Sequence, residues 1–273
     1  MEWELHQDPP RSAAYNMAKD EVCLERAHHT GRPALRLYGW EHLTLSIGRA
    51  QQVAREIDLA ACRAAAVPLV RRITGGRAVL HGSDLTYAVT APTSLPGFEG
   101  GIMPIYRALS QVFVRFLREL DCRPEVKTYT GRERIELASA ICFSTPSAFE
   151  ILVEGRKLIG SAQRRLPTAF LQHGSLPLAP QWPLLARLFV DASEASLREQ
   201  MTDLESLGVA AHWSAEALRE RLVAAFAAEL DVTFVPARWD AQDEAAVQAL
   251  LPRYAPPEMT SPAAPPRTTA AGD

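Results

Sequence analysis

The chain has 273 residues, of which 47% are hydrophobic, and it carries a formal net charge of −3 at pH 7. These values allow a domain with a sizeable core and argue against a nucleic-acid-binding protein, which needs a strongly basic surface. The sequence has no apolar run long enough to cross a membrane, and its acidic first residues lack the pattern of an export signal, so we expect a cytoplasmic protein.

The first half of the chain alternates helical and strand-like patterns. Residues 12–29 have apolar side chains at helical spacing after Ser12, a possible N-cap. Within this helix Asn16 and Asp20 lie one turn apart, and we expect Asp20 on a solvated face. Strand-like runs with one buried face follow at 34–38 and 43–48, then a short helix over 57–66 and strand-like runs at 67–70 and 85–89.

A helix over 104–120 opens the second half of the chain, and the polar residues 121–140 predict an irregular loop. Three strand-like runs follow at 148–153, 157–161 and 169–173, with Glu154-Gly155-Arg156 as a tight hairpin between the first two. After about residue 180 the patterns are mostly helical, near 181–190, 194–202, 214–230 and 240–251, with a short strand at 232–235. This order predicts an α+β fold over residues 1–255, followed by a disordered Pro/Ala-rich tail over 256–273.

The stretch from Arg71 to His81 has the sequence Arg-Arg-Ile-Thr-Gly-Gly-Arg-Ala-Val-Leu-His and lies between two strand-like runs. Because glycine has no Cβ, the Gly75-Gly76 pair allows the backbone to approach a ligand closely. The flanking arginines would suit a phosphate or a carboxylate. Taken alone, the stretch is better explained as a tight turn with solvated arginines.

Cysteine spacing excludes some kinds of site and suggests another. The four cysteines, Cys23, Cys62, Cys122 and Cys142, form no Cys-x-x-Cys pair, so neither a metal site nor a redox motif is predicted. Cys142 precedes a strand-like run, in a loop position where reactive groups are commonly held. A thiolate needs a nearby cation, and a hairpin could bring Lys157 close to it. Incidental placement explains a single loop cysteine as well as catalysis does.

Two histidines lie at the ends of strand-like runs, His81 and His173. Either could act as a general base near neutral pH, although a structural histidine is the more common outcome. The small residues Gly160, Ser161 and Ala162 follow Lys157 and could let a ligand lie against the backbone.

Three motifs, in this order and spacing, resemble the biotin/lipoate protein ligase and transferase superfamily. They are the stretch from Arg71 to His81, Gly155-Arg156-Lys157-Leu158-Ile159-Gly160-Ser161-Ala162-Gln163, and Gln172-His173-Gly174-Ser175-Leu176. Asn16-Met17-Ala18 and residues 43–48 also resemble its N-terminal motifs, so the resemblance covers about residues 10–180. Ile141-Cys142-Phe143 is similar to the cysteine-dependent octanoyltransferase branch of that superfamily, the LipM type.

The resemblance implies a ligase/transferase-like catalytic domain with a mixed β-sheet flanked by helices, and it implies no cofactor. The implied activity moves an octanoyl group from octanoyl-acyl carrier protein to a lysine of a lipoyl domain or of the glycine-cleavage H protein. Cys142 would carry the octanoyl group as a thioester, and Lys157 would assist. The residues that match substrate-binding motifs are Arg72, Thr74, Gly75, Gly76, Arg77, His81, Gly160, Ser161, Ala162, His173 and Gly174.

Two further features concern the surroundings of this site. Family members commonly have an acid directly after the loop histidine, whereas Gly82 follows His81 here. Arg164 and Arg165 come just after the lysine strand, and we expect them near the site, in contact with an acidic partner protein.

Three alternatives stay open. The first is an ATP-dependent lipoate or octanoate ligase, in which Lys157 would contact an acyl-adenylate and Cys142 would be inert. The second is an amidotransferase that moves octanoyl between two lipoyl-bearing proteins. The third is a non-catalytic module that holds a lipoyl or acyl-carrier domain in the same pocket.

Overall fold

The computed structural model describes residues 1–128 and 149–255. Cys142 and most of the predicted loop over 121–140 lie outside the described residues, as does the predicted tail over 256–273.

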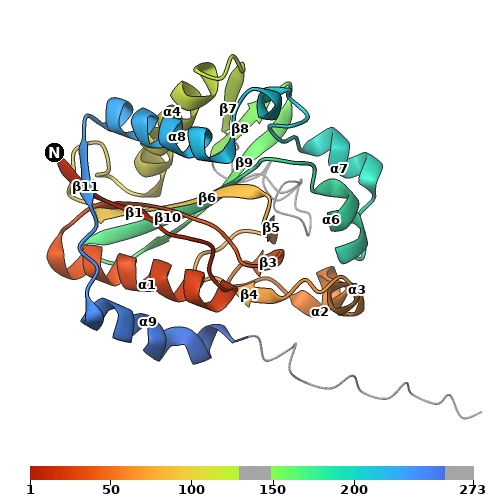
Figure 1. Ribbon diagram of the computed structural model, residues 1–273, viewed down its shortest axis with the longest axis horizontal. Helices are drawn as coiled ribbons and strands as arrows, with labels where there is room; N and C mark the ends of the chain where they lie inside the picture. The colour runs from red at the N-terminus through yellow and green to blue at the C-terminus, as the bar shows by residue number, and fades with distance from the viewer. Residues whose placement is uncertain (129–148, 256–273) are drawn as a thin grey trace, which may run out of the picture.

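A mixed sheet forms the centre of the molecule (Figure 1). Within the described ranges it has eight strands in the order β11-β1-β2-β6-β10-β9-β8-β7. β1 pairs in parallel with β2 and β11, and all other neighbours are antiparallel, so the mixed sheet is confirmed. The strands are β1 (Glu2–Gln7), β2 (Ala34–Tyr38), β6 (Asp84–Pro92), β7 (Pro124–Thr128), β8 (Phe149–Val153), β9 (Arg156–Arg165), β10 (Ala169–Pro177) and β11 (Thr233–Pro236).

The hairpin between β8 and β9 has the predicted turn. Glu154 and Gly155 both have positive φ, at 54° and 73°, as expected for a two-residue turn between antiparallel strands. The prediction of an irregular segment was wrong for β7, which pairs with β8 from Pro124 opposite Val153 onward. Polar side chains at a sheet edge tolerate solvent, so composition alone did not separate this strand from a loop.

Helices cover both faces of the central sheet (Figure 1). The helices α1 (Ala13–Thr30) and α9 (Ala241–Tyr254) lie on one face, and α4 (Ile102–Arg118) and α8 (Ala215–Leu230) lie on the other. Ser12 caps α1 by accepting a hydrogen bond from the Tyr15 N–H, and Gly31 ends the helix in a left-handed conformation. No helix of the described residues is long and apolar enough to cross a membrane.

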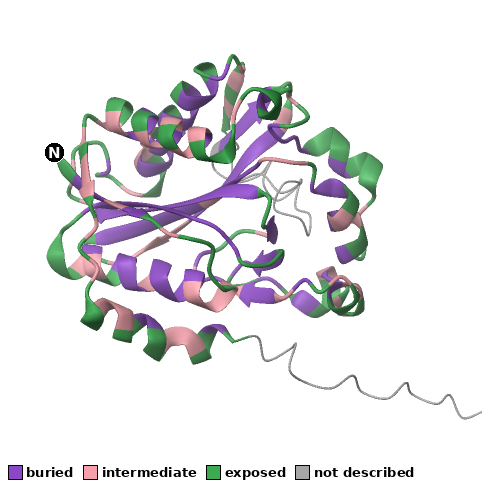
Figure 2. Ribbon diagram, viewed as in Figure 1, coloured by how far each residue is buried: buried purple, intermediate pink, exposed green. Residues whose placement is uncertain are grey.

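The hydrophobic core fills the space between the sheet and the helices, and the strands are buried along most of their length (Figure 2). Phe113 of α4 and Phe226 of α8 pack against Tyr87 of β6 on one face. The prediction of one buried face for residues 34–38 was wrong, because every residue of β2 is buried. A central strand that is covered on both faces has no solvent-exposed side.

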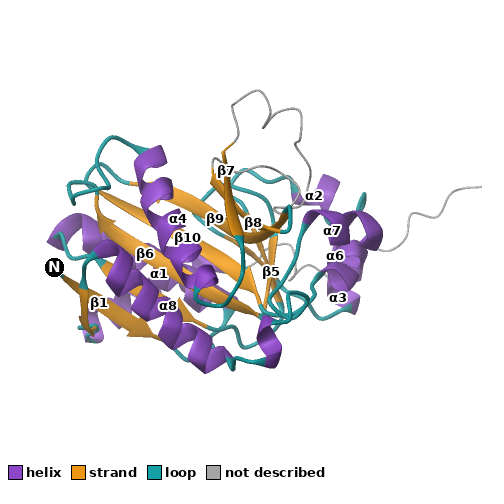
Figure 3. Ribbon diagram, turned by 90° about the horizontal axis from the view of Figure 1, so that it is seen from above, coloured by secondary structure: helices purple, strands orange, loops and turns teal. Residues whose placement is uncertain are grey.

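A second, smaller sheet contains β3 (Thr44–Ile47), β4 (Leu69–Arg71) and β5 (Val79–His81). β3 lies in the middle, parallel to β4 and antiparallel to β5. The two strands around the Gly75-Gly76 loop therefore flank β3 and do not form a hairpin with each other. All of β3 is buried too, against the expectation of one buried face. The helices α2 (Val53–Glu56), α3 (Leu59–Ala64), α6 (Trp182–Leu188) and α7 (Glu194–Gln200) gather beside this sheet (Figure 3).

Candidate active site

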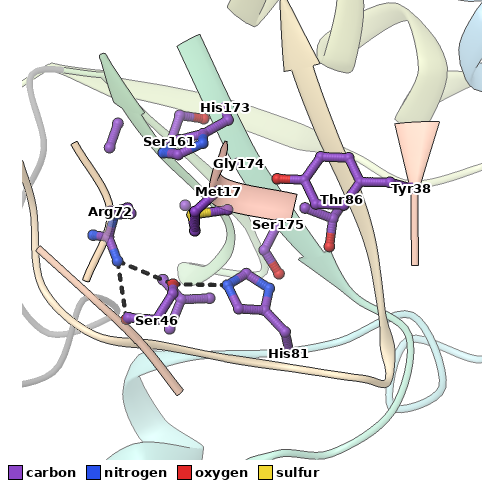
Figure 4. A pocket seen from close by; sticks show the side chains of 13 residues that line it. Met17, Tyr38, Ser46, Arg72, His81, Thr86, Ser161, His173, Gly174 and Ser175 are labelled. Atoms are coloured by element: carbon purple, nitrogen blue, oxygen red, sulfur yellow. Dashed lines mark hydrogen bonds between the residues drawn. The ribbon is translucent and has the colours of Figure 1, made fainter. Parts of the chain in front are cut away.

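A small chamber lies between the two sheets (Figure 4). Its volume is about 30 Å³, so a ligand of several carbon atoms requires side chains to move. The thioether of Met17, on α1, is the most adaptable group in the wall. The central sheet contributes Tyr38, Thr86, Gly160, Ser161, Ala162, His173, Gly174 and Ser175, and the smaller sheet with its loop contributes Ser46, Arg72, Val79 and His81.

The small residues of β9 and β10 leave room for this chamber. Gly160 pairs with Ser175 and Ala162 pairs with His173, so these side chains share one face of the sheet. Gly174 has no space for a side chain, because a Cβ atom there would lie 2.5 Å from the carbonyl oxygen of Gly160.

The loop from Arg72 to Arg77, which we call the Gly loop, packs backbone to backbone against the end of β3. A Cβ atom on Gly48 would lie 1.9 Å from the carbonyl oxygen of Gly76, and Gly76 has a φ of +84°. The glycines thus allow one chain segment to approach another. Arg77 binds Glu56 through its Nη1 atom at 2.8 Å, so its side chain does not line the chamber.

One hydrogen-bonded relay joins α1 to the Gly loop through β10. Asp20 Oδ2 lies 2.8 Å from His173 Nδ1, and His173 Nε2 lies 2.7 Å from Thr74 Oγ1. Arg72 Nε donates to the same threonine oxygen at 3.1 Å. We call this series the His173 relay.

Burial and neighbouring charges set the protonation states of Asp20 and His173. Burial alone would raise the pKa of the Asp20 carboxyl, but the charge of Arg36 and the hydrogen bond from His173 hold it below the ordinary value. Burial also lowers the pKa of His173, although Asp20 acts in the opposite direction. His173 is therefore neutral at neutral pH and donates from Nδ1 to Asp20. Its Nε2 atom accepts the hydroxyl proton of Thr74.

A second relay reaches Arg72 from the other side. Asp84 Oδ2 lies 2.8 Å from His81 Nδ1, and His81 Nε2 lies 2.8 Å from Ser46 Oγ. Arg72 Nη1 donates to that serine oxygen at 3.1 Å (Figure 4). We call this series the His81 relay. The indole of Trp40 stacks on His81 with ring centroids 4.2 Å apart.

Asp84 takes the place of the acid that family members commonly have directly after the loop histidine. Burial raises the pKa of its carboxyl, but the charge and hydrogen bond of His81 and the Gly82 N–H outweigh burial and hold the pKa low. Thr86 and Ser175 also donate hydrogen bonds to this carboxylate, each at 2.7 Å.

The expectation of a solvated Asp20 was wrong. Asp20 is 1% exposed and binds Arg36 Nη1 at 2.6 Å, and Arg36 also binds Asp8 at 2.6 Å. Sequence reasoning did not single out Arg36, although an arginine between Leu35 and Leu37 in a buried strand is a detectable signal for an internal ion pair.

Lys157 begins β9 and does not line the chamber. Its Nζ lies 2.5 Å from Glu150 Oε1 on β8, and both residues are buried. Gly160, which does line the chamber, lies about 10 Å from Lys157 along the strand. Arg164 and Arg165 are at the far end of β9, about 23 and 26 Å from Lys157 along the strand. Arg164 lines a surface pocket together with Arg72 and Ile73 of the Gly loop, and its contact with a partner protein stays a prediction. The strand is longer than its apolar run, because polar residues continue the pairing with β10 as far as Arg165.

The structure thus brings most of the predicted site residues together. Hydrogen bonds join Arg72 to Thr74 and Thr74 to His173, and Ser46 joins His81 to Arg72. Gly160, Ser161, Ala162 and Gly174 line the chamber. The carbonyl oxygens of Gly75 and Arg77 accept from Arg72 Nη2. Their roles, and that of Cys142, stay predictions. Among residues 1–128 and 149–255, no group of histidine, cysteine and carboxylate side chains has the arrangement of a metal site.

Comparison with known proteins identifies a matching protein family. The sequence profile of the family described as "Lipoyl protein ligase A/B catalytic domain" matches residues 12–227. The chain is 39% identical to an octanoyltransferase LipM of Kyrpidia tusciae, over 92% of this chain and 96% of that protein. It is 36% identical to an octanoyltransferase LipM of Moorella thermoacetica, over 93% and 95% of the two chains.

Solved structures share the fold at lower sequence identity. A bipartite lipoate protein ligase from Thermoplasma acidophilum superposes with a TM-score of 0.77 at 21% identity and covers 93% of each chain. Lipoate-protein ligase A bound with ATP superposes with a TM-score of 0.78, also at 21% identity, over 93% of this chain and 95% of that one. These similarities confirm the α+β ligase-like fold.

Proposed function

The chain belongs to the lipoyl protein ligase A/B catalytic domain family, and we propose that it transfers octanoyl groups from octanoyl-acyl carrier protein to a lysine of a lipoyl domain or glycine-cleavage H protein. The similarity to LipM octanoyltransferases over more than nine-tenths of the chain carries this conclusion. The chain is accordingly an acyltransferase of lipoate biosynthesis. The following steps propose how its residues act, in the cytoplasm.

In the first step, the Cys142 thiolate attacks the carbonyl carbon of the octanoyl thioester. A new thioester forms on Cys142, and the carrier's phosphopantetheine leaves as a thiolate. One thioester replaces another, so the step is close to neutral in energy and needs no ATP. Lys157 supports the reaction as a buried cation that favours the thiolate.

In the second step, the ε-amine of the acceptor lysine attacks the Cys142 thioester. A C–N bond forms, the C–S bond breaks, and Cys142 is released as a thiol after the amine loses a proton. Lys157 assists the transfer of that proton. The amide product is lower in energy than the thioester, so the overall reaction proceeds without a nucleotide.

The chamber is the proposed site for the octanoyl chain. It begins at Gly160, about 10 Å along β9 from Lys157, so a chain whose reacting carbon lies near Lys157 reaches it with its distal carbons. Each methylene that is buried contributes about 0.8 kcal/mol, which gives useful but finite selectivity for chain length.

Mass spectrometry of the intact protein tests this proposal. The protein is mixed with octanoyl-acyl carrier protein without ATP, and we expect a mass increase of one octanoyl group that a lipoyl domain then removes. The Cys142→Ala variant should acquire no octanoyl group. A requirement for ATP would support a ligase. Octanoyl loading from an octanoylated lipoyl protein alone would support an amidotransferase. The absence of both loading and turnover would support a binding module.

A further inference from the structure

A groove with a basic wall lies beside the Gly loop, on the face of the central sheet that α1 and α9 cover (Figure 1). Its volume is about 220 Å³. The wall holds two glutamates of α1, Glu21 and Glu25, and five arginines from distant segments, namely Arg49, Arg71, Arg72, Arg164 and Arg253. Positive charge is therefore concentrated here, although the whole chain has a formal net charge of −3.

We propose that this basic groove is the docking surface for the carrier protein that delivers the octanoyl thioester, and that Arg49 and Arg164 bind it. The anions that these arginines would meet are acidic side chains of the carrier and the phosphate at the root of its phosphopantetheine arm. This inference rests on the proposed function, because it assumes that an acyl carrier is the donor. Since the chain itself is slightly acidic, attraction of an acidic partner requires a local basic surface of this kind.

The arginines of the basic groove differ in what they bind within the protein. Arg253 is paired with Glu21 at 2.6 Å. All three nitrogen atoms of the Arg72 guanidinium group donate to acceptors inside the protein. In the ranges that the structure describes, by contrast, the guanidinium groups of Arg49 and Arg164 bind no other group. These two side chains therefore have their donors available for an incoming anion.

The backbone of Arg49 is fixed at the groove, so only its side chain has to adjust to a partner. Its N–H donates to the carbonyl oxygen of Thr74 at 2.9 Å, which joins it to the Gly loop. Arg71 Nη1 donates to the carbonyl oxygens of Gly48 and Gln51 at 2.9 and 3.0 Å. Arg71 thus holds the turn on which Arg49 lies, and this preorganisation lowers the cost of binding.

Strand alternation separates Arg164 from Arg165. Arg164 shares one face of β9 with Gly160 and Ala162 and lines the basic groove. Arg165 points to the opposite face, and a Cβ atom on Gly101, just before α4, would lie 3.5 Å from its Nη1 atom. Because α1 and α4 cover opposite faces of the sheet, the contact with an acidic partner is assigned to Arg164 and not to Arg165 (Figure 1).

The distance from Lys157 favours the carrier over the acceptor domain as the occupant of the basic groove. Arg164 lies about 23 Å from Lys157 along β9. A phosphopantetheine arm has about 13 bonds between phosphorus and sulfur and extends about 15 Å, and the Arg164 side chain covers most of the remaining distance. The lysine side chain of an acceptor extends only about 6 Å, so the acceptor must hold its backbone close to the thioester. A docking surface this far from Lys157 therefore suits a partner with a long arm.

Charge reversal in two double variants tests the inference. Arg49→Glu/Arg164→Glu changes the basic groove. Arg118→Glu/Arg165→Glu is the matched control, because it makes the same change in net charge on the α4 side of the sheet. For each full-length protein, kcat and KM are measured for octanoyl-acyl carrier protein and for a lipoyl domain, at low salt and near 0.5 M salt. Thermal unfolding shows whether each variant is folded.

At low salt, we expect the groove variant to raise the KM for octanoyl-acyl carrier protein at least about tenfold, with kcat changed by less than about twofold. High salt should reduce this difference, since it screens exposed charges. The kcat/KM for the lipoyl domain should stay unchanged, and the control variant should resemble the wild-type protein with both substrates. If the groove variant does not fold, Arg49→Ala/Arg164→Ala replaces it, with a smaller rise in KM expected.

Three results overturn the inference: an unchanged carrier KM in the folded groove variant, an equal rise in the control variant, or a loss of kcat/KM for the lipoyl domain in place of the carrier. The last result would assign the basic groove to the acceptor. Absence of octanoyl transfer from the carrier by the wild-type protein is a separate result that overturns the proposed function itself.

Discussion

Lys157 Nζ lies 2.5 Å from Glu150 Oε1, and the exposed fractions of these residues are 2% and 4%. A buried ion pair contributes little net stability compared with apolar side chains, but removing one partner leaves a buried charge without compensation. The pair holds a buried cation at the start of β9, and its structural effect can be separated from the proposed chemical role of Lys157.

The first prediction separates these effects. Glu150→Gln should lower the free energy of unfolding by about 3 kcal/mol, because Lys157 loses a buried anionic partner. The double variant Glu150→Leu/Lys157→Met should recover most of this loss and still fail to transfer octanoyl. Urea denaturation and transfer assays check both results. A double variant that transfers octanoyl normally would exclude a chemical role for Lys157.

The second prediction concerns the two half-reactions at Lys157. Lys157→Arg keeps a positive charge but cannot release a proton near neutral pH. Loading of Cys142 from the octanoyl-carrier should therefore continue, while transfer to the acceptor lysine should slow by at least about tenfold. Rapid-quench measurement resolves the two steps. Equal slowing of both steps, or no slowing, would contradict the assigned roles.

The third prediction distinguishes the cysteines. Burial raises the pKa of Cys23 to about 12 and that of Cys62 to about 11, so both thiols are protonated at neutral pH and are poor nucleophiles. Burial also raises the pKa of Cys122. Single alanine variants at these three positions should still form the octanoyl adduct, whereas Cys142→Ala and Cys142→Ser should not. An adduct on folded Cys142→Ala would place the nucleophile elsewhere.

The fourth prediction concerns acid stability. The pKa of His6 is lowered from its ordinary value of 6.5 to about 3. Burial is the largest cause, and the charge of Lys19 is the second. The unfolded chain binds a proton at this position below about pH 6.5 and the folded chain does not, so stability falls as the pH falls. Between pH 7 and pH 5 this group should remove about 2 kcal/mol from the free energy of unfolding.

His6→Phe tests this contribution, since it keeps the ring packed near Trp239 and removes the titration. Urea denaturation at pH 7 and pH 5 should show a decrease that is about 2 kcal/mol smaller than in the wild-type protein. His212→Phe, at an exposed position, is the control and should leave the decrease unchanged. An identical decrease in wild type and His6→Phe would contradict the assignment.

The fifth prediction concerns chain length. Met17 lines the chamber, and Met17→Ala should enlarge it at a cost of about 2–5 kcal/mol in stability. We expect kcat/KM for decanoyl-carrier to rise relative to octanoyl-carrier. Val22→Ala, at a buried position of α1 outside the chamber wall, should destabilise the protein without changing this preference. A preference that shifts equally in both variants would remove Met17 from the specificity site.

Local pattern in the sequence determined the elements that depend on neighbouring residues. The helix over residues 12–29 and the Glu154-Gly155 hairpin were confirmed, because helical spacing, an N-cap and turn residues act within a few positions. The family motifs likewise identified most of the residues that surround the chamber. Neither source of information showed that β4 and β5 would flank β3, since strand order depends on pairing between distant segments.

Only the tertiary structure decided the arrangement of the site. Asp20 and His173 are separated by 153 positions in the chain, and Thr74 and His173 by 99, yet each pair shares a hydrogen bond. A carboxylate on a polar helix face looks solvated from the sequence, because only the packed sheet supplies the buried Arg36 that makes its burial favourable. The two relays therefore exist only once the sheets, α1 and the Gly loop have packed, because burial and long-range pairing together decide which polar groups meet.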